Sequence, residues 1–155
     1  MPFVKPLPLI TKAAYSVGHV HNDLCASMWF TYLLLFLTEV IGFSGVKASN
    51  LLLIGQVIDG IATPLVGILS DKGSGILCYT KRKSWHLLGT ILTAISFPFI
   101  YHSSVFSVGD VDSTGLFIYY IPFICLFQIG WAIIQINHFS LIPELTPKDS
   151  EKNTF

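Results

Sequence analysis

One short stretch of the sequence concentrates side chains that could bind an ion, a proton or a polar solute. Its residues at steps of three and four, which share one face of a helix, are Gln56, Asp59, Gly60, Thr63, Gly67 and Ser70. Asp59 stands in the middle of an otherwise apolar segment. Because a carboxylate at the centre of a bilayer costs about 3 kcal/mol, it should face a protein-lined cavity rather than lipid. We interpret Asp59 as an ion, proton or substrate site, with a buried structural pair as the alternative.

A second polar patch lies in the first long apolar segment, with Asn22 beside Asp23. The residues of that patch at steps of three and four are Ser16, His19, Asp23 and Ser27. At 1.5 Å per residue, Asp23 lies about 15 Å along its helix, and Asp59 lies about 14 Å along the next helix from the opposite side. Both acids therefore come close to the midplane, where we expect one shared cavity. Gln135, about 28 Å along a later segment, lies nearer the membrane surface.

A third group of residues combines a glycine, an acid and a basic cluster. Gly67 precedes Asp71 by one helical turn, and the charged residues that follow are Lys72, Lys81, Arg82 and Lys83. Glycine permits close contact between helices. We interpret the charges as a gating motif, whose interhelical ion pairs break and re-form as a carrier rocks. The alternative is plain topogenic charge, which only sets the orientation in the membrane.

The other chemically active side chains do not form a catalytic set. The histidines lie on different segments near helix ends, so we expect only His19, one turn before Asp23, to have a relay partner. Cys25, Cys78 and Cys125 have no C-x-x-C spacing and are interpreted as reduced thiols or small buried side chains. No metal-ligand spacing, nucleophile motif or phosphate-binding loop is present, so we expect neither an enzyme nor a resident cofactor or metal.

The composition indicates where these residues must act. Of the 155 residues, 52% are hydrophobic and 12% are charged, and the mean hydropathy is +0.66. Soluble domains carry about 25% charged residues, so the sequence predicts a membrane protein. The net charge of zero argues against a nucleic-acid partner.

Four apolar segments predict an all-α, multi-pass protein embedded in the lipid bilayer. The predicted spans are about 13–40, 50–70, 85–101 and 116–137, between an N-terminal segment 1–12 and a tail 138–155. If the spans alternate, Lys47 lies on one side, and the basic residues on the other side are Lys5, Lys12, Lys72, Lys81, Arg82, Lys83, Lys148 and Lys152. The positive-inside rule then predicts that both termini are cytoplasmic.

Four strings of residues resemble a known family. These are G-H-V-H-N-D-L-C-A-S-M-W-F-T-Y-L-L-L-F-L (18–37), G-Q-V-I-D-G-I-A-T-P-L-V-G-I-L-S-D (55–71), R-K-S-W-H-L-L-G-T (82–90) and F-S-L-I-P-E-L-T (139–146). They are similar to the glycoside-pentoside-hexuronide:cation symporters of the major facilitator superfamily. That family has about twelve helices in two halves of six, so the resemblance implies four helices from the N-terminal half, and hence a fragment.

The resemblance also implies roles for individual residues. In the sugar symporters an acid on helix one and an acid on helix four hold the sugar, and two acids on helix two bind the cation. Asp23, with Asn22 beside it, and Gln135 are then the expected substrate-binding residues, and Asp59 and Thr63 are the expected cation or proton site. Because Thr63 supplies a neutral hydroxyl where the second acid would stand, the site is a poor sodium site by charge count. A proton is therefore the expected coupling ion.

The resulting hypothesis is the N-terminal part of a secondary transporter for a small polar solute. The resemblance is strongest to an animal branch of the family, which implies cysteine import in the membranes of lysosomes or melanosomes. A carbohydrate:cation symporter driven by protons or sodium is one alternative. A non-transporting truncated product that interacts with a full-length carrier is another.

Overall fold

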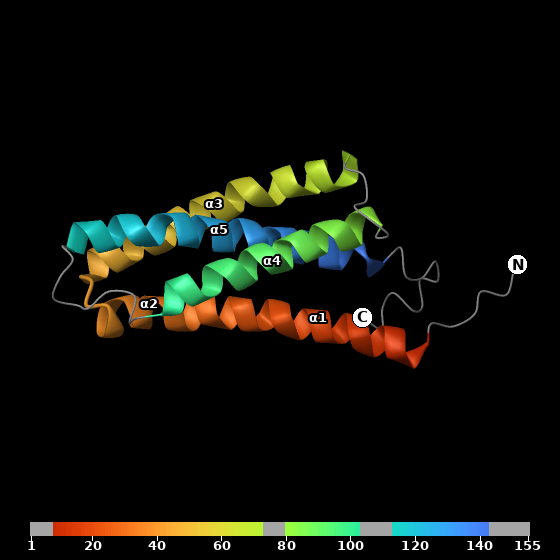
Figure 1. Cartoon of the computed structure of the whole chain (residues 1–155), viewed down its shortest axis with the longest axis horizontal. Coiled ribbons are helices and arrows are strands. Elements are labelled where there is room, and N and C mark those ends of the chain that lie inside the picture. Colours follow the sequence, from red (N-terminus) through yellow and green to blue (C-terminus); the bar gives the residue numbers. More distant parts are fainter. Residues whose placement is uncertain (1–7, 73–79, 103–112, 143–155) are drawn as a thin grey trace, which may run out of the picture.

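The computed structural model describes residues 8–72, 80–102 and 113–142, and their regular structure is entirely helical. A continuous first helix consists of α1 (Leu9–Ser27), η1 (Met28–Tyr32), α2 (Leu33–Leu35) and η2 (Phe36–Val40) (Figure 1). It is followed by α3 (Gly45–Lys72), α4 (Lys81–Tyr101) and α5 (Ser113–Ser140). All four helices are long and apolar enough to cross a membrane. The predicted fold class, an all-α membrane protein with four spans, is confirmed.

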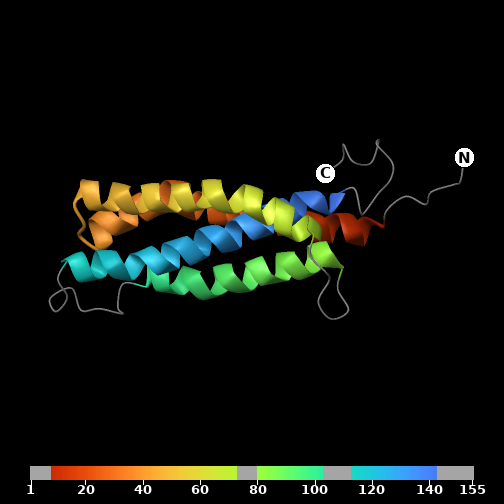
Figure 2. The ribbon, with the colours of Figure 1, turned by 90° about the horizontal axis from the view of Figure 1, so that it is seen from above.

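The four helices form an elongated bundle in which α5 is the central member. The helix α5 packs against α3, α4 and α1, and Figures 1 and 2 show it running between α3 and α4. Half of its most apolar window, 50%, is buried inside the chain, against 22% for the first helix and for α3 and 28% for α4. The red start of α1 and the blue end of α5 lie at the same end of the bundle (Figure 1). The helices therefore alternate in direction, as the sequence analysis assumed.

The observed helices extend beyond the apolar segments from which they were predicted. The first helix begins at Leu9, directly after Pro8 as its N-cap, instead of at Ala13. Likewise α4 begins at Lys81 and includes the basic cluster that the hydropathy pattern had placed in a loop. The backbone of lysine and arginine can remain helical while the charged ends of their side chains reach water. The end of the apolar segment therefore falls inside the helix and does not mark its end.

The first helix contains two π-helical turns, which the sequence pattern did not predict. The N–H of Leu33 bonds to the carbonyl of Met28, and the N–H of Ile41 bonds to that of Phe36. From α4, the Tyr101 hydroxyl donates a 2.8 Å hydrogen bond to the Met28 carbonyl. Such turns widen the helix locally, and here a tyrosine from a neighbouring helix gives the carbonyl at the first of them a second hydrogen bond.

Glycines decide how closely the helices approach. A Cβ added at Gly89 of α4 would lie 2.7 Å from the carbonyl oxygen of Gly130 of α5, and one added at Gly55 of α3 would lie 2.3 Å from the ring of Trp29. Between η2 and α3, Gly42 has a φ of +80°, a conformation that favours glycine and turns the chain back into the bundle. Close backbone contact at small residues is the usual basis of helix packing in membranes.

Candidate functional site

The candidate coupling site lies on a single face of α3. Thr63 donates a 3.3 Å hydrogen bond from its hydroxyl to Oδ1 of Asp59, one turn away, and both side chains are half-buried. Beside them, Gly60 has no atom within 4 Å of the position where a Cβ would stand. The arrangement presents a carboxylate and a hydroxyl together, with open space next to them in the described part of the chain. Such a pair can accept a proton or contribute two oxygen ligands to a cation.

The three expected substrate-binding residues are not gathered in one place. Asp23 is exposed on α1, and Gln135 is half-buried on α5. Asn22 is buried, and its Oδ1 accepts a 2.8 Å hydrogen bond from Nε1 of Trp131. Asn22 therefore links α1 to α5 through this hydrogen bond. Its position in the sequence did not indicate this contact. The shared cavity for Asp23 and Asp59 remains a prediction.

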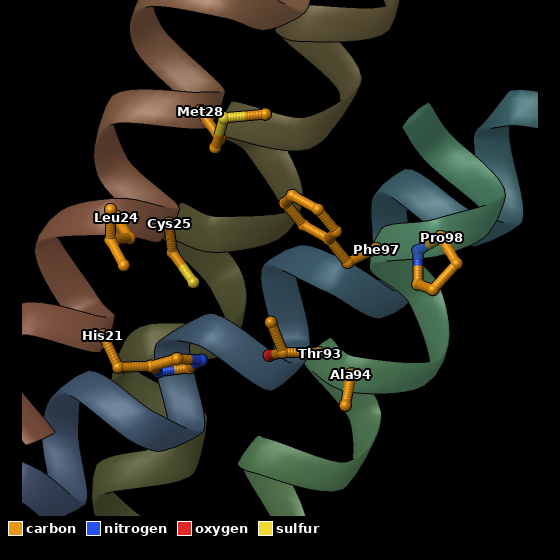
Figure 3. Close-up of a pocket in the computed structure, with 8 residues that line it drawn as sticks. All are labelled: His21, Leu24, Cys25, Met28, Thr93, Ala94, Phe97 and Pro98. Carbon is orange, nitrogen blue, oxygen red and sulfur yellow. The ribbon is translucent and has the colours of Figure 1, made fainter. Parts of the chain in front are cut away.

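A cavity lies between the first helix and α4 (Figure 3). It has a volume of about 440 Å³, and its walls are mostly apolar. From the first helix His21, Cys25 and Met28 face it, and from α4 Thr93 and Phe97 do so. Neither Asp23 nor Asp59 lines it. In size the cavity suits a small solute, but its walls carry few of the polar groups that would hold one.

The predicted gating residues meet where α3 ends and α4 begins. Asp71 forms an ion pair with Arg82, and Arg82 also donates a 2.9 Å hydrogen bond to the Ser70 hydroxyl. Lys81 donates from its ammonium to the carbonyl oxygen of Asp71 at 3.0 Å. The interhelical ion pair expected from the sequence is therefore present. Lys72 and Lys83 are exposed.

Gly67 does not make the close contact that was expected of it. A Cβ added there would meet no atom within 4 Å among the described residues. The close approaches involve Gly89 and Gly130 instead, because α4 and α5 pack face to face while this side of α3 has no neighbouring helix in the described chain. Glycine in a sequence shows where contact is possible, and only the packing decides where it occurs.

Three histidines that the sequence analysis treated as separate come together in the structure. The ring of His138 in α5 lies 5.8 Å from the ring of His19 in α1 and 5.8 Å from that of His86 in α4. The sequence analysis considered only Asp23 as a relay partner of His19, and it did not anticipate that His19 lies beside His138. The histidines are 67 and 52 residues apart in sequence, and the antiparallel course of the helices unites them. No local spacing could reveal that.

The cysteines agree with their interpretation where the structure describes them. Cys25 is a buried free thiol and Cys125 is a half-buried one. Cys78, the basic residues Lys5, Lys148 and Lys152, and most of the predicted terminal segments lie outside the described residues. Among the residues described, no group of three histidine, cysteine, aspartate or glutamate side chains has a geometry suited to a metal ion.

A bundle of long apolar helices, with an acid at mid-length on α3 and a basic cluster at one end, is typical of membrane transporters. The family model described as MFS/sugar transport protein matches residues 14–155. Because the match covers most of the sequence, the chain belongs to this family of membrane transporters. No catalytic family is indicated.

Individual relatives agree with this assignment. The chain is 49% identical over 97% of its length to major facilitator superfamily domain-containing protein 12 of Homo sapiens, of which it covers 32%. It is 32% identical over 94% of its length to an uncharacterized symporter of Synechocystis sp., covering 27% of that protein. It is 26% identical over 96% of its length to the mouse sodium-dependent lysophosphatidylcholine symporter 1, covering 27%. The chain thus spans about a third of the length of the curated relatives that it matches. No solved structure matches the chain significantly.

Proposed function

We propose that this chain is the N-terminal part of a secondary transporter that moves a small polar solute through coupling to a proton. The observation that carries the proposal is the Asp59–Thr63 pair on α3, a helix long enough to cross a membrane. A carboxylate at such a depth in the membrane is energetically costly, and such residues commonly mark functional sites. Binding of a coupling ion is a function that one carboxylate and one hydroxyl can perform.

The charge count favours a proton over sodium. Sodium binds best to several hard oxygen ligands, and two carboxylates bind it more strongly than one. Here a single acid has a neutral hydroxyl as its partner. A lone carboxylate in a poorly hydrated setting can instead bind a proton, which neutralises it completely. One relative is named as sodium-dependent, so sodium coupling is the alternative that the experiment must separate.

The proposed substrate class follows from the chemistry of two candidate side chains, Asp23 of α1 and Gln135 of α5. An exposed carboxylate at Asp23 could bind an ammonium group, and the amide of Gln135 could bind a carboxyl or hydroxyl group. A zwitterionic solute such as cysteine satisfies both, in agreement with the resemblance to the animal branch and its lysosomal or melanosomal location. The family description as sugar transport supports a carbohydrate as the second candidate.

The Asp71–Arg82 pair is the proposed gate. Asp71 lies at the C-terminus of α3, and Arg82 lies near the N-terminus of α4. Each charge is at the helix end where the helix dipole disfavours it. The ion pair between the two side chains offsets this cost. Such a pair can open at low cost when the helices move apart. With Lys81 to Lys83 beside it, this end of the bundle, where α1 begins and α5 ends, is the proposed cytoplasmic side.

Uptake into proteoliposomes tests the proposed function in a full-length carrier that contains this sequence. Cysteine or a sugar is offered with an inward proton gradient, with a sodium gradient, or with neither. Uptake of cysteine driven by the proton gradient alone is the expected result, and Asp23→Asn should raise the KM for the solute. A strict requirement for sodium at fixed pH would refute proton coupling, and an unchanged KM would remove Asp23 from the substrate site.

A non-transporting truncated product that binds a full-length carrier is the second candidate. The tagged 155-residue chain and the carrier would be co-expressed and purified in mild detergent. Recovery of the carrier with the chain, together with reduced uptake, would favour this role. Independent migration of the two would exclude it.

A further inference from the structure

The strongest unassigned feature is the π-helical turn Met28–Tyr32 in the first helix. A π turn contains one residue more than an α-helical turn, and such turns often lie where a helix bends or serves a function. The N–H of Leu33 bonds to the carbonyl of Met28 across this turn, and the Tyr101 hydroxyl of α4 bonds to the same oxygen at 2.8 Å. One carbonyl oxygen therefore joins the turn to a neighbouring helix.

The second π turn, Phe36–Val40, is supported differently. The hydroxyl of Thr38 donates hydrogen bonds to the carbonyl oxygens of Leu34 at 3.0 Å and Leu35 at 3.3 Å. The hydroxyl that supports the second turn thus belongs to the same helix, whereas the one that supports the first turn belongs to α4. A movement of α4 away from the first helix would therefore break the hydroxyl bond of the first turn and leave those of the second intact.

The inner side of the first turn is packed tightly. Trp29 is 1% exposed, and its ring lies over Gly55 of α3, where an added Cβ would be only 2.3 Å away. The same ring stacks on that of Phe127 of α5, with 6.0 Å between the two centroids. Because close packing on α3 and α5 fixes the inner side, the first helix can move most easily on the side that faces α4.

The side that faces α4 adjoins two cavities, and Met28 lines both of them. The cavity of about 440 Å³ in Figure 3 lies beside α1, where Cys25 also lines it. A second cavity of about 290 Å³ lies beside the π turns, where Tyr32 and Tyr101 line it. The walls of both are mostly apolar. With space on either side of the Tyr101–Met28 bond, the side chains there can move without displacing a close-packed neighbour.

We infer that Met28–Tyr32 is a hinge of the first helix, which the Tyr101 hydroxyl holds closed against α4. When this hydrogen bond breaks, the first helix bends at the turn, Met28 moves away from α4, and the two cavities join. The contact of Trp29 with α3 and α5 persists through the movement. This conformational change between two helices does not depend on the solute or the ion proposed above.

Hydrogen–deuterium exchange of the 155-residue chain in detergent micelles tests the hinge. Tyr101→Phe removes the hydroxyl and keeps the ring, so the amide of Leu33 and its neighbours in the turn should exchange roughly fivefold faster, as expected for the loss of one hydrogen bond. Tyr119→Phe is the matched control, because the Tyr119 hydroxyl donates a 3.3 Å hydrogen bond from α5 to the Phe99 carbonyl of α4. It should leave exchange in the turn unchanged. Exchange at Leu33 that Tyr101→Phe leaves unaltered, or that Tyr119→Phe accelerates equally, would overturn the inference.

Chemical labelling of Cys25 distinguishes a hinge from the loss of a single hydrogen bond. Cys25 is a free thiol, 5% exposed, that lines the cavity of Figure 3. If the first helix bends away from α4, N-ethylmaleimide should modify Cys25 several-fold faster in Tyr101→Phe than in the native chain or in Tyr119→Phe. Peptide mass spectrometry separates this site from Cys78 and Cys125. Faster exchange in the turn without faster labelling of Cys25 would show that the turn loosens without bending, and would refute the hinge.

Discussion

The helices α3 and α5 are alike in sequence character and opposite in environment. Each has 28 residues, and their most apolar windows have mean hydropathies of 1.8 and 1.9. Yet 22% of that window is buried in α3 and 50% in α5. Hydropathy indicates whether a helix can enter the membrane, but it does not indicate which helix lies at the centre of the bundle.

The polar side chains of the two helices differ accordingly. In α5, Gln128, Asn137 and His138 are buried among the other helices. In α3, Asp59 and Thr63 bond to each other on a face where Gly60 meets open space in the described chain. These three side chains of α5 are therefore enclosed by the bundle, whereas Asp59 and Thr63 of α3 are available to a solute, an ion or a further helix.

The largest expected effect comes from removing the charge on α3. In a full-length carrier, Asp59→Asn should lower coupled uptake at least about tenfold, since losing a charged partner costs about 1.5–3 kcal/mol. Thermal stability in detergent should change little, because the substitution conserves volume and α3 is open there. Uptake into proteoliposomes and the melting temperature are measured together. Normal uptake between pH 5 and 8 would return Asp59 to a structural role.

Glycine substitutions compare the packing of the two helices directly. Gly89→Ala, which places a methyl group 2.7 Å from a carbonyl oxygen of α5, should destabilise the fold by about 1–3 kcal/mol. The matched change on α3 is Gly60→Ala, which meets no atom within 4 Å and should stay within about 0.5 kcal/mol of the native chain. Unfolding of the 155-residue chain in mixed micelles gives both values. Similar losses for the two variants would contradict the contrast in burial.

Removing one hydrogen bond of α5 should destabilise the chain more than removing one of α3, although both effects should be smaller than that of Gly89→Ala. Trp131→Phe removes the donor to Asn22 and leaves a buried acceptor unpaired, at a cost of about 1 kcal/mol. Thr63→Val removes the donor to Asp59 but should alter stability less, because the carboxylate there can turn to the open side. The same unfolding assay measures both changes. A larger loss from Thr63→Val would mean that α3 is packed more tightly than α5.

The smallest expected effect concerns the choice of ion. Thr63→Asp adds a second acid one turn from Asp59 and should introduce a modest sodium stimulation of uptake in the full-length carrier, since two carboxylates make a better cation site. Initial rates with and without sodium at constant pH provide the measurement. The unmodified carrier serves as the control, and a sodium response in it equal to that of the variant would argue against the proton as the coupling ion.

Much of the fold could be predicted because the bilayer restricts the options. Apolar segments of sufficient length had to be helices, and their number and order were confirmed. The ends were less predictable, since Lys81 to Lys83 remain helical beyond the apolar part of α4. The Asp71–Arg82 pair was predictable because only one short connection separates the two helices.

Residues that depend on the packing of distant helices were interpreted less well. Asn22 was assigned to substrate binding on the strength of its neighbour Asp23, whereas the structure bonds its Oδ1 to Trp131. Gly67 was assigned to a close contact that occurs at Gly89 and Gly130. In each case the residue type was suited to the role, but a second helix had to supply the other half of the contact.

The sequence by itself determined the class of protein, the number of spans and the face that carries Asp59 and Thr63, because these depend on solvent transfer and on the period of one helix. Only the tertiary structure decided that α5 is central, that Asn22 bonds to Trp131, and that three histidines meet at one end. These features combine residues from helices whose relative rotation and depth are set by side-chain packing, and packing is a property of all four helices together.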